Sequence, residues 1–141
     1  MKHYTYQKGI TQPKTLLDAI GVSTTPLTET SNSQQIAGAK SVMIELIGTG
    51  ITTRSAVLTI TAAVDGGTNF RAYNMLIDNL ANANTEMLTR VASKTLAATG
   101  HNILWMTPET LGAITHIKAT LIITDTGTPA GTFSVIVTVN Y

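Results

Sequence analysis

Residues 54–64 read Arg-Ser-Ala-Val-Leu-Thr-Ile-Thr-Ala-Ala-Val, and this stretch decides the class of fold. Every even-numbered position from Ala56 to Val64 is apolar, and threonines stand at two of the positions between them. A repeat of two residues is typical of a β-strand that packs one face against a core. Residues 41–47 repeat this alternation and place Glu45 on the outward face. The sequence therefore predicts two core strands, one in each segment.

The composition extends this prediction to the whole chain. It contains 26 threonines together with many valines and isoleucines, which fit pleated sheets better than helices. Glycine-containing turn signals, such as Asp-Gly-Gly-Thr-Asn at 65–69, separate further strand candidates at 70–77, 87–95 and 101–106. We predict an all-β fold, an antiparallel two-sheet β-sandwich or jelly roll with an N-terminal arm and at most one or two short helical turns.

The C-terminal part contains two more alternating segments, 114–124 and 132–140. Between them lies Asp-Thr-Gly-Thr-Pro-Ala-Gly at 125–131, which contains two glycines and a proline. Such a segment between two strand-like runs is typical of a hairpin turn. We expect the two segments to pair with each other.

One short helix is expected near the N-terminus, at 13–20. Thr11 stands where a cap is expected, Pro13 is near the first helical position, and Gly21 follows the last one. The leucines and isoleucine of this segment form its apolar stripe.

The next residues, 22–35, contain mainly Ser, Thr, Asn and Gln, with no apolar rhythm, and are expected to form a long loop. The sequence thus divides into an N-terminal arm with a polar connecting loop, residues 1–35, and a β-sandwich domain, residues 36–141.

Length, charge and cysteine content limit the function. A chain of 141 residues is long enough for one domain with its own core. A net charge of +1 gives no electrostatic reason to expect nucleic acid or a membrane as partner, and no apolar run is long enough for a transmembrane helix. The absence of cysteine excludes disulfides, thiolate nucleophiles and cysteine-based zinc sites.

No spacing of reactive residues points to catalysis or to a cofactor. His3, His101 and His116 are isolated in the sequence, so we expect no metal site. The turn at 65–69 offers oxygen ligands for calcium, but no glutamate closes the loop, and a plain strand-to-strand turn is the expected structure. The chain is therefore expected not to be an enzyme.

The aromatic residues allow two interpretations. Trp105 and Tyr73 would form a sugar-binding platform if their rings were exposed, but the apolar neighbours of Trp105 favour a place in the core. Tyr4 and Tyr6 share one face of the N-terminal arm, so we assign them to an interface, either with the edge of their own sandwich or with a neighbouring subunit.

Charged residues make up only 12% of the chain, about half of the ~25% of an ordinary soluble domain. Either the surface is rich in free hydroxyl and amide groups, or much of it is buried against partners. The low charge favours an assembly, with copies of the chain as partners.

From Ala56 onward the sequence resembles the small β-sandwich virion proteins of tailed bacteriophages. A hydrophobic strand ends in an Asp-Gly turn followed by an aromatic residue, here Asp65, Gly66 and Phe70. Similar strands follow at 114–121 and 131–139.

This resemblance implies a capsid decoration, auxiliary or cement protein without catalytic activity. The implied partners are copies of the chain, as a homo-oligomer and preferably a trimer, and the major capsid protein or other virion proteins. The protein would be made in the host cytoplasm and located on the virion surface. The alternative is a carbohydrate-binding or adhesion module of a tail, baseplate or extracellular protein, with a glycan as partner.

Overall fold

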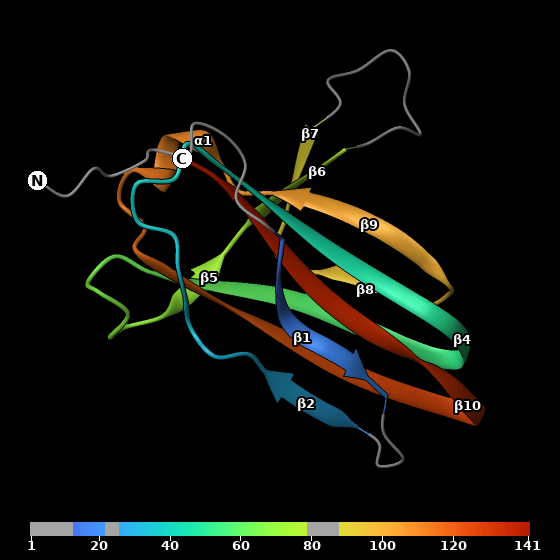
Figure 1. Cartoon of the computed structure of the whole chain (residues 1–141). Coiled ribbons are helices and arrows are strands. Elements are labelled where there is room, and N and C mark those ends of the chain that lie inside the picture. Colours follow the sequence, from blue (N-terminus) through green and yellow to red (C-terminus); the bar gives the residue numbers. More distant parts are fainter. Residues whose placement is uncertain (1–12, 22–25, 79–87) are drawn as a thin grey trace, which may run out of the picture.

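The computed structural model describes residues 13–21, 26–78 and 88–141, and it confirms the all-β prediction (Figure 1). Ten strands form an antiparallel sheet, and α1 (Pro108–Leu111) is the one helix of the described residues. It is too short to span a membrane. The strands are β1 (Lys14–Ile20), β2 (Leu27–Thr30), β3 (Gln34–Gln35), β4 (Ser41–Ala63), β5 (Arg71–Tyr73), β6 (Met75–Asp78), β7 (Leu88–Val91), β8 (Lys94–Leu96), β9 (Gly100–Trp105) and β10 (His116–Asn140).

The centre of the sheet is a long ribbon formed by β4 and β10. The two strands pair from Ser41 opposite Asn140 to Ala63 opposite His116. Both strands bend near their middle, and the teal and green halves of β4 run in opposite directions on the two sides of the bend (Figure 1). We call residues 41–48 with 132–140 the first arm, and residues 54–63 with 116–125 the second arm.

Glycines and bulges allow the ribbon to bend. The pairing register shifts on both sides of Ala130. Gly50, Gly127 and Gly131 have positive φ angles, which cost glycine little because it has no Cβ. At Gly131 an added Cβ would lie 2.5 Å from the carbonyl oxygen of Gly50, so the two strands touch at the bend.

Shorter strands widen both arms. The first arm is flanked by β1 on one side and by β9, β6 and β7 on the other. The second arm is flanked by β2 and β3 on the side of β10, and by β5 and β8 on the side of β4. The strand candidates at 70–77, 87–95 and 101–106 are thereby confirmed as β5 with β6, β7 with β8, and β9.

The inward side chains of both arms form one hydrophobic cluster. Alternation along β4 and β10 is confirmed, because even positions of β4 and odd positions of β10 are buried, and Glu45 faces outward. Fully burying one such aliphatic or aromatic side chain contributes about 1.5–3 kcal/mol to stability. The buried residues of the ribbon in this cluster are Val42, Ile44, Leu46, Ala56, Leu58, Ile60, Ile117, Ala119, Leu121, Ile123, Phe133, Val135, Val137 and Val139.

The predicted C-terminal hairpin is wrong. Residues 116–125 pair with the second half of β4, and residues 132–140 pair with its first half, so the two segments are not partners. The segment 125–131 reverses the chain as part of a bent two-stranded ribbon. A ribbon bend needs positive φ angles as a hairpin turn does, and both therefore contain glycine.

The predicted helix at 13–20 is also wrong, because these residues form β1 at the edge of the first arm. The register shifts twice along β1, and Ala19 has a φ angle of 47°. Each bulge shifts the alternation by one residue, so the spacing of Leu16, Leu17 and Ile20 resembles that of a helix. Pairing with β10 and burial of Leu17 stabilise a strand here in place of the expected helix.

The predicted loop at 22–35 contains two strands in its described part. Both β2 and β3 pair with β10, and the hydroxyls of Thr30 and Thr120 lie 3.0 Å apart. The strand was missed because β2 is polar on both faces except at Leu27. The sheet of the described residues thus begins at Lys14, before the expected division between residues 35 and 36.

Candidate functional site

The histidines do not form a site in the described part of the chain. His101 Nε2 lies 2.6 Å from Glu45 Oε2 on the neighbouring strand, and His116 Nδ1 lies 3.0 Å from Thr115 Oγ1. No group of three or more potential metal ligands occurs among residues 13–21, 26–78 and 88–141. His3, Tyr4 and Tyr6 lie outside these ranges, so the interface assigned to the two tyrosines stays a prediction.

The turn at 65–69 is confirmed, and its carboxylate holds the turn together. Asp65 Oδ1 accepts hydrogen bonds from the backbone N–H groups of Thr68 (3.1 Å) and Asn69 (3.0 Å). Asp65 Oδ2 accepts one from the Asn69 side-chain amide at 2.6 Å. The backbone and side-chain hydrogen bonds from Asn69 hold the pKa of Asp65 below its usual value. Both carboxylate oxygens therefore accept hydrogen bonds from residues of the turn itself.

The prediction that Trp105 belongs to the core is wrong, because its side chain is 37% exposed. Its neighbours in the chain, Leu104 and Met106, are buried. Strand β9 alternates, so Ile103 and Trp105 face outward together with His101, although the apolar run at 103–106 itself contains no polar residue to mark the outer face.

These outward residues belong to an apolar row that crosses three strands. Trp105 on β9 lies opposite Met43 on β4 and opposite Leu76 on β6. Directly opposed residues on neighbouring strands have their side chains on the same face. Ile103, two residues from Trp105, is 42% exposed on this face. We call Met43, Leu76, Ile103 and Trp105 the outer apolar row.

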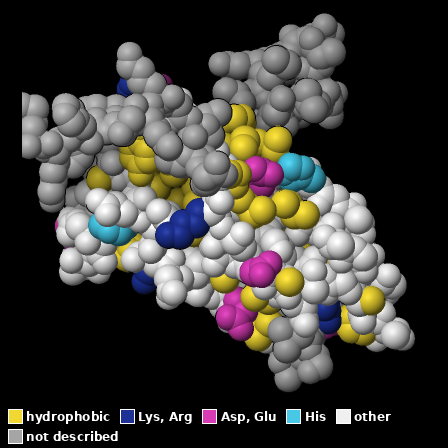
Figure 2. Space-filling view, in the orientation of Figure 1, with side chains coloured by type: hydrophobic (Ala, Val, Ile, Leu, Met, Phe, Trp, Pro, Cys, Tyr) yellow, Lys and Arg dark blue, Asp and Glu magenta, His cyan; other side chains and the backbone are white. Residues whose placement is uncertain are grey.

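Ionisable side chains border this row: Glu45 lies opposite Ile103, and Arg90 on β7 lies opposite Leu76. Figure 2 shows hydrophobic side chains close to a histidine and an acidic side chain, on a face on which charged groups are sparse. His101 and Glu45, which contact each other, are the ionisable neighbours on β9 and on the first arm of β4. Large apolar side chains exposed on a strand face are typical of surfaces that bind another protein.

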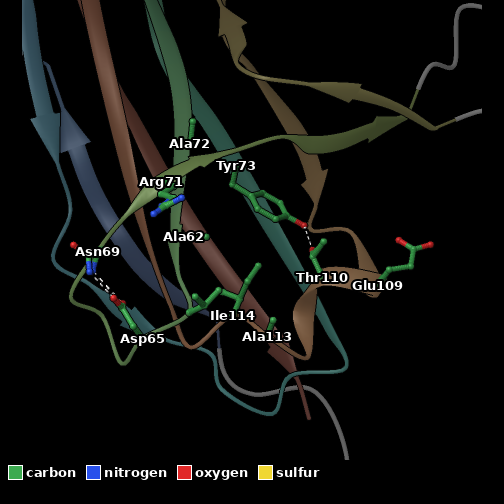
Figure 3. A pocket seen from close by; sticks show the side chains of 11 residues that line it. Ala62, Asp65, Asn69, Arg71, Ala72, Tyr73, Glu109, Thr110, Ala113 and Ile114 are labelled. Atoms are coloured by element: carbon green, nitrogen blue, oxygen red, sulfur yellow. Dashed lines mark hydrogen bonds between the residues drawn. The ribbon is translucent and has the colours of Figure 1, made fainter.

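A second feature is an open groove between β5 and α1, with a volume of about 670 Å³ (Figure 3). Asp65 and Asn69 lie at one end, Tyr73 and Thr110 in the middle, and Glu109 at the other end. The rest of the wall is mainly small and apolar, from Ala62, Val64, Ala72, Ala113 and Ile114, with one cation, Arg71.

Two hydrogen bonds fix Tyr73 in this groove. Its hydroxyl accepts from the backbone N–H of Thr107 at 2.6 Å and lies 2.7 Å from Thr110 Oγ1. Thr110 Oγ1 in turn donates to the Thr107 carbonyl at 2.9 Å. The tyrosine thus connects β5 to the start of α1, and its ring is held in place as a wall of the groove.

The charged side chains of the groove differ in whether they already form hydrogen bonds within the chain. Asp65 is occupied by the turn, whereas the side chains of Arg71 and Glu109 form no hydrogen bond or ion pair with any part of the chain that the structure describes. One cation and one carboxylate are therefore free to contact a ligand.

Sequence reasoning did not find this groove. Its residues come from two segments separated by more than thirty positions, 62–73 and 109–114. Of these residues, the sequence patterns single out only the turn at 65–69 and Tyr73. The alanines that leave room for the cavity carry no sequence signal, since alanine is common in any β-rich core.

Comparison with protein-family models, with curated proteins and with solved structures gives no match for this chain.

Proposed function

We propose that this chain is a non-catalytic structural protein of a phage virion, a capsid decoration or cement protein that assembles with copies of itself on the particle surface. The observation that carries the proposal is the outer apolar row, in which Trp105 and Ile103 are 37% and 42% exposed. Burying these side chains against a partner is favourable, and aromatic residues are enriched at protein interfaces.

We infer further that the two arms are the two sheets of a β-sandwich. Their inward side chains belong to one cluster, which is what two packed sheets require. This arrangement leaves the opposite face of each arm available for contacts with other proteins. The outer apolar row lies on such a face of the first arm.

Three contacts of ionisable groups in the described part of the chain support a structural role. Arg54 pairs with Asp125, Glu45 contacts His101, and Asp65 is occupied by its own turn. In each case a charge stabilises the local fold. A homo-oligomer, preferably a trimer, on the major capsid protein follows from the resemblance to phage virion proteins, with neither nucleic acid nor membrane as partner.

Two measurements test the proposal. Mass spectrometry of density-purified phage particles whose genome encodes this chain should detect it in many copies per particle, and its absence from purified particles would refute the virion role. Native mass spectrometry of the full chain should show an oligomer, and a monomer at all concentrations would refute self-assembly.

The alternative function, a carbohydrate-binding or adhesion module, is favoured by a different observation. The groove beside β5 combines a fixed aromatic ring with free charged groups. Binding there does not exclude a place on the virion, because the groove and the outer apolar row share none of their residues.

A further inference from the structure

The groove between β5 and α1 has the size of a ligand site. Small-molecule sites in proteins usually have volumes of ~300–1,000 Å³, and this groove measures about 670 Å³. It is open to solvent along one side, so a chain-like ligand with one or two units inside can continue beyond it. A second cavity, lined by residues that include Arg54, Ala97 and Thr126, is smaller, at about 230 Å³.

The wall of the groove favours a ring with an apolar face. The Tyr73 hydroxyl is engaged by Thr107 and Thr110, so the aromatic ring is positioned before any ligand arrives. Ala62 and Ala113 keep the floor shallow and apolar. Sugar rings carry C–H groups on one face and hydroxyls at their edge, and a fixed aromatic ring packs well against the C–H face.

The charges of the groove select among ligands. Arg71 offers planar donors that match a carboxylate, while Glu109 accepts hydrogen bonds from hydroxyl groups. Asp65 is held ionised by its turn, so the two carboxylates outnumber the single cation. A ligand with two or more negative charges, such as a phosphate ester, would be repelled. A singly charged carboxylate surrounded by hydroxyls fits the donors and acceptors.

We propose that this groove binds an acidic carbohydrate of the uronic acid class, with Arg71 contacting the carboxylate, Tyr73 the ring face and Glu109 the hydroxyls. The proposal goes beyond the structural role in the virion and depends on the groove alone. The virion role and the carbohydrate site can therefore be refuted separately, because assembly is measured without any sugar.

The test is a titration of the full-length, ¹⁵N-labelled protein with the methyl glycoside of galacturonic acid, which carries a single carboxylate, followed by amide chemical shifts. The matched ligand is the methyl ester of the same glycoside, which keeps the ring and removes the charge. The matched variants are Arg71→Gln, which removes the cation of the groove, and Arg90→Gln, which removes an exposed arginine of β7 that does not line the groove. Unchanged spectra outside the substituted strand show that each variant is folded.

We expect the acid to shift amides of β5 and α1 at millimolar concentrations. The ester and Arg71→Gln should each weaken binding roughly tenfold or more, because a charge-assisted hydrogen bond is lost, and Arg90→Gln should have no effect. The proposal is overturned if the acid causes no shifts, if shifts appear away from the groove, if acid and ester bind equally, or if both arginine variants behave alike.

Discussion

Arg54 on β4 and Asp125 on β10 form a two-pronged ion pair at the bend of the central ribbon. Arg54 Nε donates to Asp125 Oδ1 at 2.7 Å, and one terminal nitrogen donates to Oδ2 at 2.9 Å. The other terminal nitrogen donates to the Gly131 carbonyl at 2.6 Å. Both side chains are nearly buried, with 6% and 7% exposed. The hydrogen bonds to Asp125 raise the pKa of Arg54. This pair joins the two strands where their regular pairing is interrupted.

Removing one partner of this pair should destabilise the fold strongly. Arg54→Ala leaves the Asp125 carboxylate buried without its cation, and such changes cost about 3–5 kcal/mol. Urea denaturation measures the loss. Arg90→Ala is the control, because this exposed arginine should cost within ~0.5 kcal/mol. Equal stability of the two variants would show that the ion pair does not hold the bend.

The close contact of the strands at the bend predicts that Gly131 cannot be replaced. Gly131→Ala would place a Cβ 2.5 Å from the Gly50 carbonyl oxygen, at a φ angle of 94°. Strain and overpacking together should cost roughly 2–4 kcal/mol. The control is Gly112→Ala, where φ is −61° and no atom lies within 4 Å of the added Cβ. Thermal unfolding should separate the two variants, and a Gly131→Ala protein as stable as wild type would contradict the bent ribbon.

The Asp65 turn predicts a dependence of stability on pH. Because the pKa of Asp65 is lower in the folded protein than its usual 3.8, its contribution is fully present above pH 3.8 and is lost as the pH falls through the folded value. Asp65→Asn does not titrate. The difference in urea midpoint between wild type and this variant should therefore be constant near neutral pH and shrink in acid. A difference in urea midpoint that is the same near neutral pH and in acid would show that the charge of Asp65 does not contribute to stability.

The alternation of the core strands was predictable from sequence, but the path of the ribbon was not. Ile60 stands between two threonines in an apolar/polar repeat of two residues, and it is buried. Which strand pairs with which depends on contacts distant in sequence, such as Ile123 opposite Ala56. The glycines at 125–131 fit a hairpin and a ribbon bend equally well, so local signals selected the wrong partner.

The errors at the candidate sites have a similar origin. Trp105 was assigned to the core because its neighbours are apolar, but the strand period places it on the outer face beside Met43. Arg71 and Glu109 carry no motif, and only the fold brings them to one groove. Single side chains can be placed on a face from the sequence once the strand phase is known, whereas a cavity between distant segments cannot.

The N-terminal arm gives a prediction for assembly. Deleting residues 1–11 removes Tyr4 and Tyr6 but leaves every residue of the described hydrophobic cluster, which begins at Leu17. We therefore expect a folded protein with reduced self-association. Circular dichroism and sedimentation velocity measure the two properties. Unfolding of the truncated chain would place the arm in its own core, and normal assembly would show that the two tyrosines are not at an interface.

The central claim, that the chain assembles through its outer apolar row, is tested most directly by native mass spectrometry of two matched variants. Ile103→Ser changes a residue of the row that is 42% exposed, and Ile122→Ser changes one on the second arm that is 40% exposed. Because both lose the same apolar group at the same exposure, their effects on folding should be alike. The account predicts that Ile103→Ser shifts the protein towards monomers while Ile122→Ser keeps the wild-type oligomer. An unchanged oligomer in Ile103→Ser, or equal loss in both variants, would contradict it.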